Sequence, residues 1–197
     1  MNHLSMFELR REVFHILSGI GFLLVLIFVP YSKYILFAIF VIGMLISMIS
    51  AYIPIPVVSN FLCLFERRCN RSFPGKGVIM FFLGSLLSIQ LFEENIAIVS
   101  ILILTFSDPI SHLVGSTFGK TKIVSKRKNI EGTVAGIAVG TALGSFLIPV
   151  WLAFIASLSA MIIELLELKV EGHIIDDNLL IPLTAGTILH FMSKLIM

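Results

Sequence analysis

The sequence predicts an all-α, polytopic integral membrane protein with about seven transmembrane helices and a cytoplasmic N-terminus. Three observations lead to this class. Hydrophobic residues make up 57% of the chain against 13% charged residues, with a mean hydropathy of +1.03. The apolar residues fall in runs of membrane-spanning length, and the basic residues concentrate in alternate connections between those runs. No long polar linker divides the chain, so residues 1–197 are expected to form a single transmembrane domain.

Apolar runs of near-spanning length define the expected helices. They are Val13–Val29, Tyr34–Tyr52, Val78–Phe92, Ile96–Phe118, Thr133–Val150, Trp151–Leu166 and Leu179–Met197. A spanning helix needs about 20 predominantly apolar residues, and the run from Val78 is shorter than that. Pro149 joins the fifth and sixth runs with almost no loop. The expected number is therefore seven, to within one.

The basic residues predict the orientation. When the connections are assigned alternately to the two sides, all of the 14 Lys and Arg residues except Lys33 and Lys194 share one side. The positive-inside rule makes that side cytoplasmic, in a cell membrane or a membrane of the endoplasmic-reticulum type. The formal net charge of +2 is too small, and the basic residues too dispersed, for nucleic-acid binding.

The segment "ILTFSDPISHLVGSTFGK" places Asp108 inside an otherwise apolar run. A carboxylate at the centre of a spanning helix costs about 2.5–3.5 kcal/mol on insertion scales, so it is a functional candidate. On one helix Asp108, His112, Gly115 and Gly119 would share a face, because their spacing follows the helical period. The competing interpretation is that Asp108 pairs with a lysine at the membrane boundary.

The next segment, "KTKIVSKRKNIEGTVAG", combines a basic loop with an acidic residue and a glycine. Lys120, Lys122 and Lys128 could bind phosphate oxygens, Glu131 could bind a metal ion, and Gly132 could let a bound group touch the backbone. Such a loop beside a carboxylate is suited to a metal-bound polyphosphate. Attraction to lipid headgroups would explain some of the same lysines.

Two further acidic segments are expected on the cytoplasmic side. "DDNLLIPLTAG" supplies Asp176, Asp177 and Asn178, whose oxygen atoms suit Mg²⁺, although one of them would also cap the last helix. Glu164 closes the sixth run, where it is either part of the site or a solvated helix end.

Arg11 and His15 lie four residues apart at the start of the first expected helix, which places both on one helical face. The pair could hold a phosphate group. It could equally extend its polar tips to the membrane surface.

Four blocks in this order resemble the CTP-dependent lipid alcohol kinases, a family that includes dolichol, phytol and yeast-type diacylglycerol kinases. The blocks are "RREVFH", "SDPISHLVGSTFGK", "KNIEGTVAG" and "DNLLIPLTAG", and they extend from residue 10 to about residue 186. Phosphatidate cytidylyltransferases share a succession like the middle two blocks. They end in a Gly-His-Gly-Gly and Asp-Arg signature, whereas this chain has "EGHIIDDN".

The resemblance implies a kinase-like domain that transfers the γ-phosphoryl group of CTP, with Mg²⁺, to the hydroxyl of a membrane isoprenoid alcohol of the dolichol, polyprenol, phytol or geranylgeraniol type. Asp108 would be a metal ligand or the base, and Asp177 would share the catalytic site. The phosphates would bind to Lys120, Lys122 and Lys128. The metal ion and the nucleotide would bind to Glu131, Asp177 and Asn178. The bound nucleotide could approach the backbone closely at Gly115, Gly119 and Gly132.

Three alternatives remain at this stage, and the oligomeric state stays open. Diacylglycerol could be the acceptor, or the protein could be a cytidylyltransferase that makes a CDP-activated lipid. A transporter with an intramembrane aspartate is disfavoured, because a transport path needs polar residues across the bilayer and these gather at one end.

Overall fold

The computed structural model describes residues 5–53, 55–56, 73–121, 128–166, 168–170 and 173–196. Within these ranges the regular elements are helices and one pair of two-residue antiparallel strands, which the all-α prediction did not contain. The elements are α1 Met6–Phe28, α2 Ser32–Tyr52, α4 Lys76–Leu91, α5 Glu94–Leu102, η1 Ile103–Ser107, α6 Asp108–Phe118, α7 Ile130–Gly144, α8 Val150–Leu166, β1 Lys169–Val170, β2 His173–Ile174 and α9 Asp177–Ile196.

The described helices correspond to the seven expected runs, because α5, η1 and α6 form one continuous helix from Glu94 to Phe118. By length and composition that helix, α1 and α2 could each cross a membrane, while α4, α7 and α8 are shorter apolar helices. The helix ends differ from the expected runs for local reasons. Ser5 caps α1 by accepting a hydrogen bond from the backbone N–H of Glu8 at 3.1 Å, so α1 begins before its apolar stretch.

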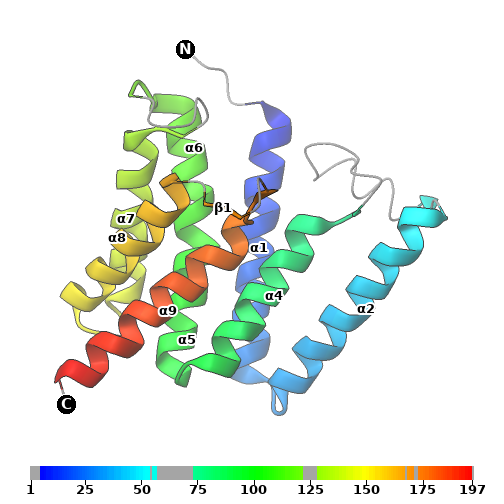
Figure 1. Cartoon of the computed structure of the whole chain (residues 1–197), viewed down its shortest axis with the longest axis horizontal. Helices are drawn as coiled ribbons and strands as arrows, with labels where there is room; N and C mark the ends of the chain where they lie inside the picture. Colours follow the sequence, from blue (N-terminus) through cyan, green and yellow to red (C-terminus); the bar gives the residue numbers. More distant parts are fainter. Residues whose placement is uncertain are drawn as a thin grey trace.

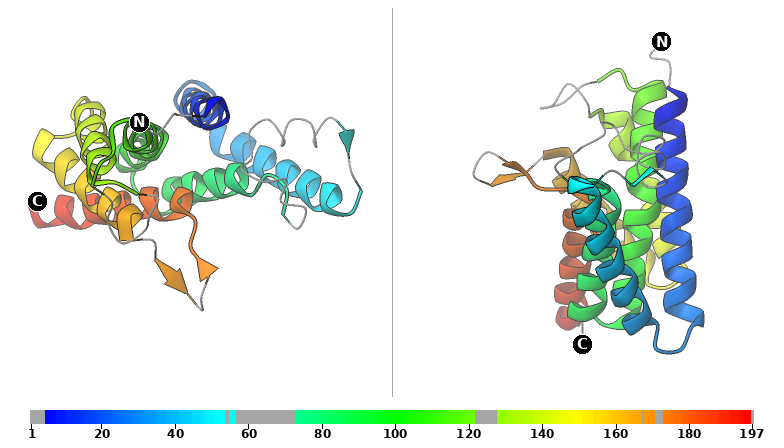
Figure 2. Two further views of the ribbon diagram at one scale, coloured as in Figure 1. Left: turned by 90° about the horizontal axis from the view of Figure 1, so that it is seen from above. Right: turned by 90° about the vertical axis from the view of Figure 1, so that its right-hand side faces the viewer.

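The continuous α5–η1–α6 helix is the centre of the bundle (Figures 1 and 2). Its membrane-length window is 72% buried, against 22% for α1 and 11% for α2. α7 packs against α6, α8 against α7, α9 against α8 and α4, and α1 against α6, so α2 is left at the edge of the bundle, in contact with α1 and α4. Val99, Ile101 and Leu104 of the central helix are fully buried in the apolar core.

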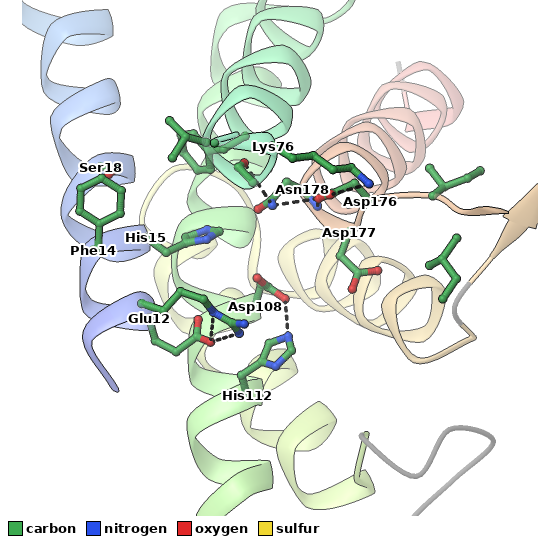
Figure 3. Close-up of a pocket in the computed structure, with 17 residues that line it drawn as sticks. Glu12, Phe14, His15, Ser18, Lys76, Asp108, His112, Asp176, Asp177 and Asn178 are labelled. Carbon is green, nitrogen blue, oxygen red and sulfur yellow. Dashed lines mark hydrogen bonds and ion pairs between the residues drawn. The ribbon is translucent and has the colours of Figure 1, made fainter. Parts of the chain in front are cut away.

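Two of the helices start within the bundle. α4 and α9 begin beside the middle of α1 and of the central helix, whereas α1 and α6 continue beyond them toward the end that carries the N-terminus (Figure 1). The first residues of α4 and α9 therefore face Asp108 (Figure 3). Helix N-termini carry partial positive charge and unpaired N–H groups, which favours anions at this depth.

The π-helical segment η1 ends immediately before Asp108 and Pro109. Proline has no N–H, and its ring clashes with the carbonyl four residues earlier in an α-helix. A local i→i+5 pattern relieves that clash, and segments of this kind are frequent at functional sites. In a π-helix each carbonyl accepts a hydrogen bond from the N–H five residues later. For Leu104 that residue is Pro109, which has no N–H, so the Leu104 carbonyl has no backbone donor at that position.

Gly84 sets the distance between α4 and α9, and we predict that Gly84→Leu destabilises the fold. A Cβ there would lie 2.3 Å from the carbonyl oxygen of Asn178 and 3.2 Å from the ring of Pro182. Overpacking of this kind costs about 1–3 kcal/mol, which thermal unfolding in detergent would detect as a lower Tm. Gly43→Leu in α2 is the control, because nothing lies within 4 Å of that Cβ position. An equal Tm for the two variants would contradict the packing role.

Candidate active site

A buried cluster of charged side chains surrounds Asp108 on the central helix. The Asp108 side chain is paired with His112 one turn later, with 3.2 Å between Oδ1 and Nε2. His112 Nε2 also lies 3.9 Å from Glu164 Oε1 at the end of α8. Asp108 is 7% exposed and Glu164 1%. The shared helical face predicted for Asp108 and His112 is therefore present, and a carboxylate from a distant helix joins it.

Lys128 connects this cluster to α9. Its Nζ lies 2.9 Å from Asp177 Oδ2 and 3.3 Å from Glu164 Oε1, and it donates to the backbone carbonyl of Glu164. Burial alone lowers the pKa of Lys128, but Glu164 and Asp177 outweigh burial and raise that pKa above its ordinary value. Lys128 is consequently a cation at neutral pH that balances the buried Glu164 carboxylate and the half-buried Asp177 carboxylate.

The start of α9 forms a second polar group. Asn178 donates to Asp176 Oδ1 from its side-chain Nδ2 at 2.9 Å and from its backbone N at 3.2 Å, and Lys76 Nζ lies 3.9 Å from Asp176 Oδ2. Burial raises the pKa of Asp177 to about 6, with the Lys128 charge acting in the opposite direction. Asp176 thus ties the first turns of α4 and α9 together, while Asp177 faces the Asp108 cluster.

Arg11 of the expected Arg11 and His15 pair contacts Glu12, and phosphate binding by the pair stays a prediction. Arg11 is paired with its neighbour Glu12, through Nε at 3.1 Å and through a guanidinium nitrogen. Glu12 is only 3% exposed, and the sequence analysis did not single it out. The sequence feature that could have identified Glu12 is its position inside "RREVFH", between Arg11 and His15. Lys76, in "PGKG", was missed in the same way.

A cavity of about 420 Å³ is lined by Asp108, His112, Asp177 and Asn178, whereas Glu164 and Lys128 lie outside its lining. Figure 3 shows Asp108 and His112 on α6 opposite Glu12 and His15 on α1, with the starts of α4 and α9 on the other side. The polar side of the cavity carries Arg11, Glu12, Asp108, His112, Asp177 and Asn178. The other side is formed by α1 and α4 and includes Phe14, Val78 and Phe81. Pockets for small molecules span about 300–1,000 Å³, so the cavity can hold the reacting parts of two substrates.

The remaining predicted residues do not line this cavity. The Glu131 carboxylate accepts hydrogen bonds from Thr121, from the backbone N at 3.1 Å and from the hydroxyl at 3.1 Å. Lys120 is exposed, and Lys122 lies outside the described residues. Their phosphate and metal contacts stay predictions.

The predicted glycines have a packing role in the structure. A Cβ at Gly132 would lie 2.3 Å from the carbonyl oxygen of Ser111, and one at Gly119 would lie 2.3 Å from Asn129 Nδ2. Asn129 Nδ2 also donates to the carbonyl of Gly115 at 2.7 Å. The close contact of α6 with α7 therefore explains Gly115, Gly119 and Gly132, and contact of these glycines with a nucleotide stays a prediction.

The side chains of the cluster are suited to a divalent cation. Asp108, His112 and Glu164 each offer one ligand atom, and these atoms lie within 4.8 Å of one another. Glu164 Oε2, Asp177 Oδ1 and Asn178 Oδ1 are buried and have no hydrogen-bond partner among the described residues. Mg²⁺ prefers oxygen ligands of this kind. Glu164 thus lies next to Asp108 as a candidate metal ligand, a role that the sequence pattern assigned to Glu131.

The chain belongs to the cytidylyltransferase family, whose family model matches residues 2–181. Among similar proteins, CTP-dependent diacylglycerol kinase 1 of Schizosaccharomyces pombe is 27% identical over 59% of this chain and 60% of its own length. This similarity confirms the resemblance to CTP-dependent lipid kinases that the four sequence blocks indicated.

Two similar proteins cover nearly the whole chain. Uncharacterized protein MJ1137 of Methanocaldococcus jannaschii is 30% identical over 93% of both chains. Uncharacterized protein RP860 of Rickettsia prowazekii is 30% identical over 90% of this chain and 91% of its own. No solved structure matches this chain.

Proposed function

We propose that this protein is a CTP-dependent lipid kinase, embedded in the membrane with its site at the cytoplasmic face, that phosphorylates the hydroxyl of a lipid alcohol. The hydroxyl oxygen forms a bond to the γ-phosphorus of CTP, the bond from that phosphorus to the β-γ bridging oxygen breaks, CDP leaves, and the hydroxyl proton passes to a base. The observation that carries this proposal is the cavity that joins a buried carboxylate cluster to an apolar wall. The kinase from Schizosaccharomyces pombe supports the choice of CTP.

The proposed roles follow from the positions of the side chains. Asp108, Glu164 and Asp177, with the amide oxygen of Asn178, would hold Mg²⁺, which neutralises phosphate oxygens when bound. Asp108 is the metal ligand or the base that accepts the hydroxyl proton. Lys128 holds Glu164 and Asp177 in place. The N-termini of α4 and α9 face the cavity and favour the negative charge of the phosphates.

The acceptor is proposed to be a membrane isoprenoid alcohol, as the sequence analysis predicts. Diacylglycerol is the second candidate, supported by the name of the relative from Schizosaccharomyces pombe. Transfer of a cytidylyl group to phosphatidic acid is the third, supported by the name of the family. That reaction would release pyrophosphate in place of CDP.

Two forms of labelled CTP test the proposal. Purified protein with Mg²⁺ is incubated with a panel containing isoprenoid alcohols, diacylglycerol and phosphatidic acid, and with CTP labelled at either the γ or the α phosphate. We expect γ label in an isoprenoid alcohol and no α label in any lipid. Transfer of γ label to diacylglycerol would correct the acceptor, whereas α label in lipid would identify a cytidylyltransferase. Greater transfer from ATP than from CTP would overturn the choice of nucleotide.

A further inference from the structure

His15 is a half-buried histidine in the middle of α1, and it lines the cavity. Its ring meets the ring of Phe81 edge to face, with centroids 5.2 Å apart and an interplanar angle of 83°. Nε2 is buried and has no hydrogen-bond partner among the residues that the structure describes. Figure 3 shows the ring extending from α1 toward the space above Asp108.

The position of the ring hydrogen determines the chemistry available at Nε2. A neutral imidazole carries one hydrogen, on either Nδ1 or Nε2. A neutral imidazole protonated at Nδ1 is a hydrogen-bond acceptor at Nε2. In that tautomer His15 presents a single acceptor atom, the unpartnered Nε2, to a bound donor.

An acceptor without a donor is costly in the interior. A buried polar group with no hydrogen bond destabilises the folded protein, and a bound donor would remove that cost. Asp108 and Glu12, whose charges act on His15, are carboxylates and supply no hydrogen when ionised. The donors Arg11 and His112 are paired with these two carboxylates. A hydroxyl group supplies one hydrogen and no charge, so it complements Nε2 without adding another cation to the cluster.

The wall next to His15 is suited to a hydrocarbon chain. Phe14 and Ser18 of α1 and Phe81 of α4 line the cavity on this side. Beyond it the ring of Phe22 packs against Phe81 and Phe82, with centroid distances of 5.9 and 5.3 Å. Ser18 is a small residue among large ones, which leaves space beside the histidine.

We propose that the α1–α4 side of the cavity is the acceptor subsite, in which His15 Nε2 accepts a hydrogen bond from the hydroxyl of the lipid alcohol and its first carbons lie along Phe14, Ser18 and Phe81. This inference rests on the proposed function and adds to it the position of the acceptor. The hydroxyl oxygen is then placed between α1 and the Asp108 cluster, where a phosphate held by that cluster would meet it.

His15→Asn tests the hydrogen bond. The asparagine side chain is shorter than that of histidine, so it places no acceptor at the position of Nε2. We expect KM for the alcohol to rise roughly tenfold, the value of one hydrogen bond, while KM for CTP stays within about twofold. His15→Gln, which returns an acceptor near the Nε2 position, should recover part of the loss. His190→Asn, on α9 beside Phe92, is the control and should change neither constant.

Ser18→Phe tests the chain position independently of the histidine. The larger side chain should raise KM for long-chain alcohols roughly tenfold or more and leave a short-chain alcohol unaffected. Gly21→Phe on the same helix is the control, because nothing lies within 4 Å of its Cβ position. Equal effects on long and short alcohols, or a rise in KM for CTP in His15→Asn, would overturn the subsite.

A photoreactive long-chain alcohol separates this inference from the proposed function. The probe binds whether or not the protein transfers phosphate, so the outcome does not depend on turnover. We expect it to label peptides containing residues 14–18 or 78–82, and to lose that labelling in Ser18→Phe but not in Gly21→Phe. Labelling of other helices would contradict the subsite even in an active kinase. Absence of γ-phosphoryl transfer with labelling at α1 intact would instead contradict the proposed reaction alone.

Discussion

Asp108→Asn is expected to abolish γ-phosphoryl transfer while the protein still inserts into membranes and purifies normally. The substitution keeps the shape of the side chain but removes the charge that pairs with His112 and that would hold the metal or accept the hydroxyl proton. Phosphoryl transfer depends mainly on positioning and charge neutralisation, and single groups with this role contribute about 10³-fold or more to the rate. The measurement is transfer of γ label from CTP to the lipid in reconstituted vesicles.

The matched control is Glu94→Gln, which removes an acidic charge from the opposite end of the same continuous helix. Glu94 is exposed and lies outside the cavity, so its variant should retain the wild-type rate. Size-exclusion profiles and Tm in detergent establish that both variants are folded. Retained activity in Asp108→Asn would remove Asp108 from the mechanism.

Lys128→Met is expected to lower both the activity and the stability of the protein. Lys128 is buried between Glu164 and Asp177, and its removal leaves two carboxylates without their shared cation. Breaking a buried ion pair by removing one partner costs about 3–5 kcal/mol, in contrast to the small effect of an exposed pair. Thermal unfolding without Mg²⁺ measures the loss, and added Mg²⁺ should recover part of it by binding the freed carboxylates.

Lys120→Met is the comparison, because the sequence analysis assigned the same phosphate contact to both lysines. Lys120 is exposed at the end of α6, so its loss should leave Tm unchanged and raise KM for CTP. If Lys128→Met instead raised KM for CTP with an unchanged Tm, Lys128 would be a phosphate ligand and the bridge between α8 and α9 would carry little stability.

Local patterns in the sequence determined the helices and one face of the site. Apolar runs identify the helical segments, because a helix inside a bilayer needs a nearly continuous stretch of apolar side chains around its backbone. Asp108 and His112 could be placed together because a spacing of four residues puts two side chains on one helical face whatever surrounds them. The same period placed Arg11 and His15 on one face, but it did not indicate that Arg11 pairs with the adjacent Glu12.

Only the tertiary structure decided which distant charges meet. Lys128 joins Glu164 and Asp177, although 36 and 49 residues separate it from them, because α7, α8 and α9 pack side by side. Glu131 is three residues from Lys128 and yet binds Thr121 outside the cluster. Packing between segments that are so far apart in the sequence depends on close contacts such as the one between α4 and α9 at Gly84. The periodicity of a single helix does not predict such contacts.

The cavity likewise required the three-dimensional arrangement. It exists because α4 and α9 begin beside the middle of α1 and the central helix, a difference in depth that hydropathy alone does not reveal. The lack of a partner at Nε2 of His15 likewise depends on how α1 packs against the central helix. The sequence by itself determined the helical class, the family and the carboxylate at its centre, because these reside in local composition and order. The partners of that carboxylate were decided by helix packing, because burial and charge pairing act between segments that are remote along the chain.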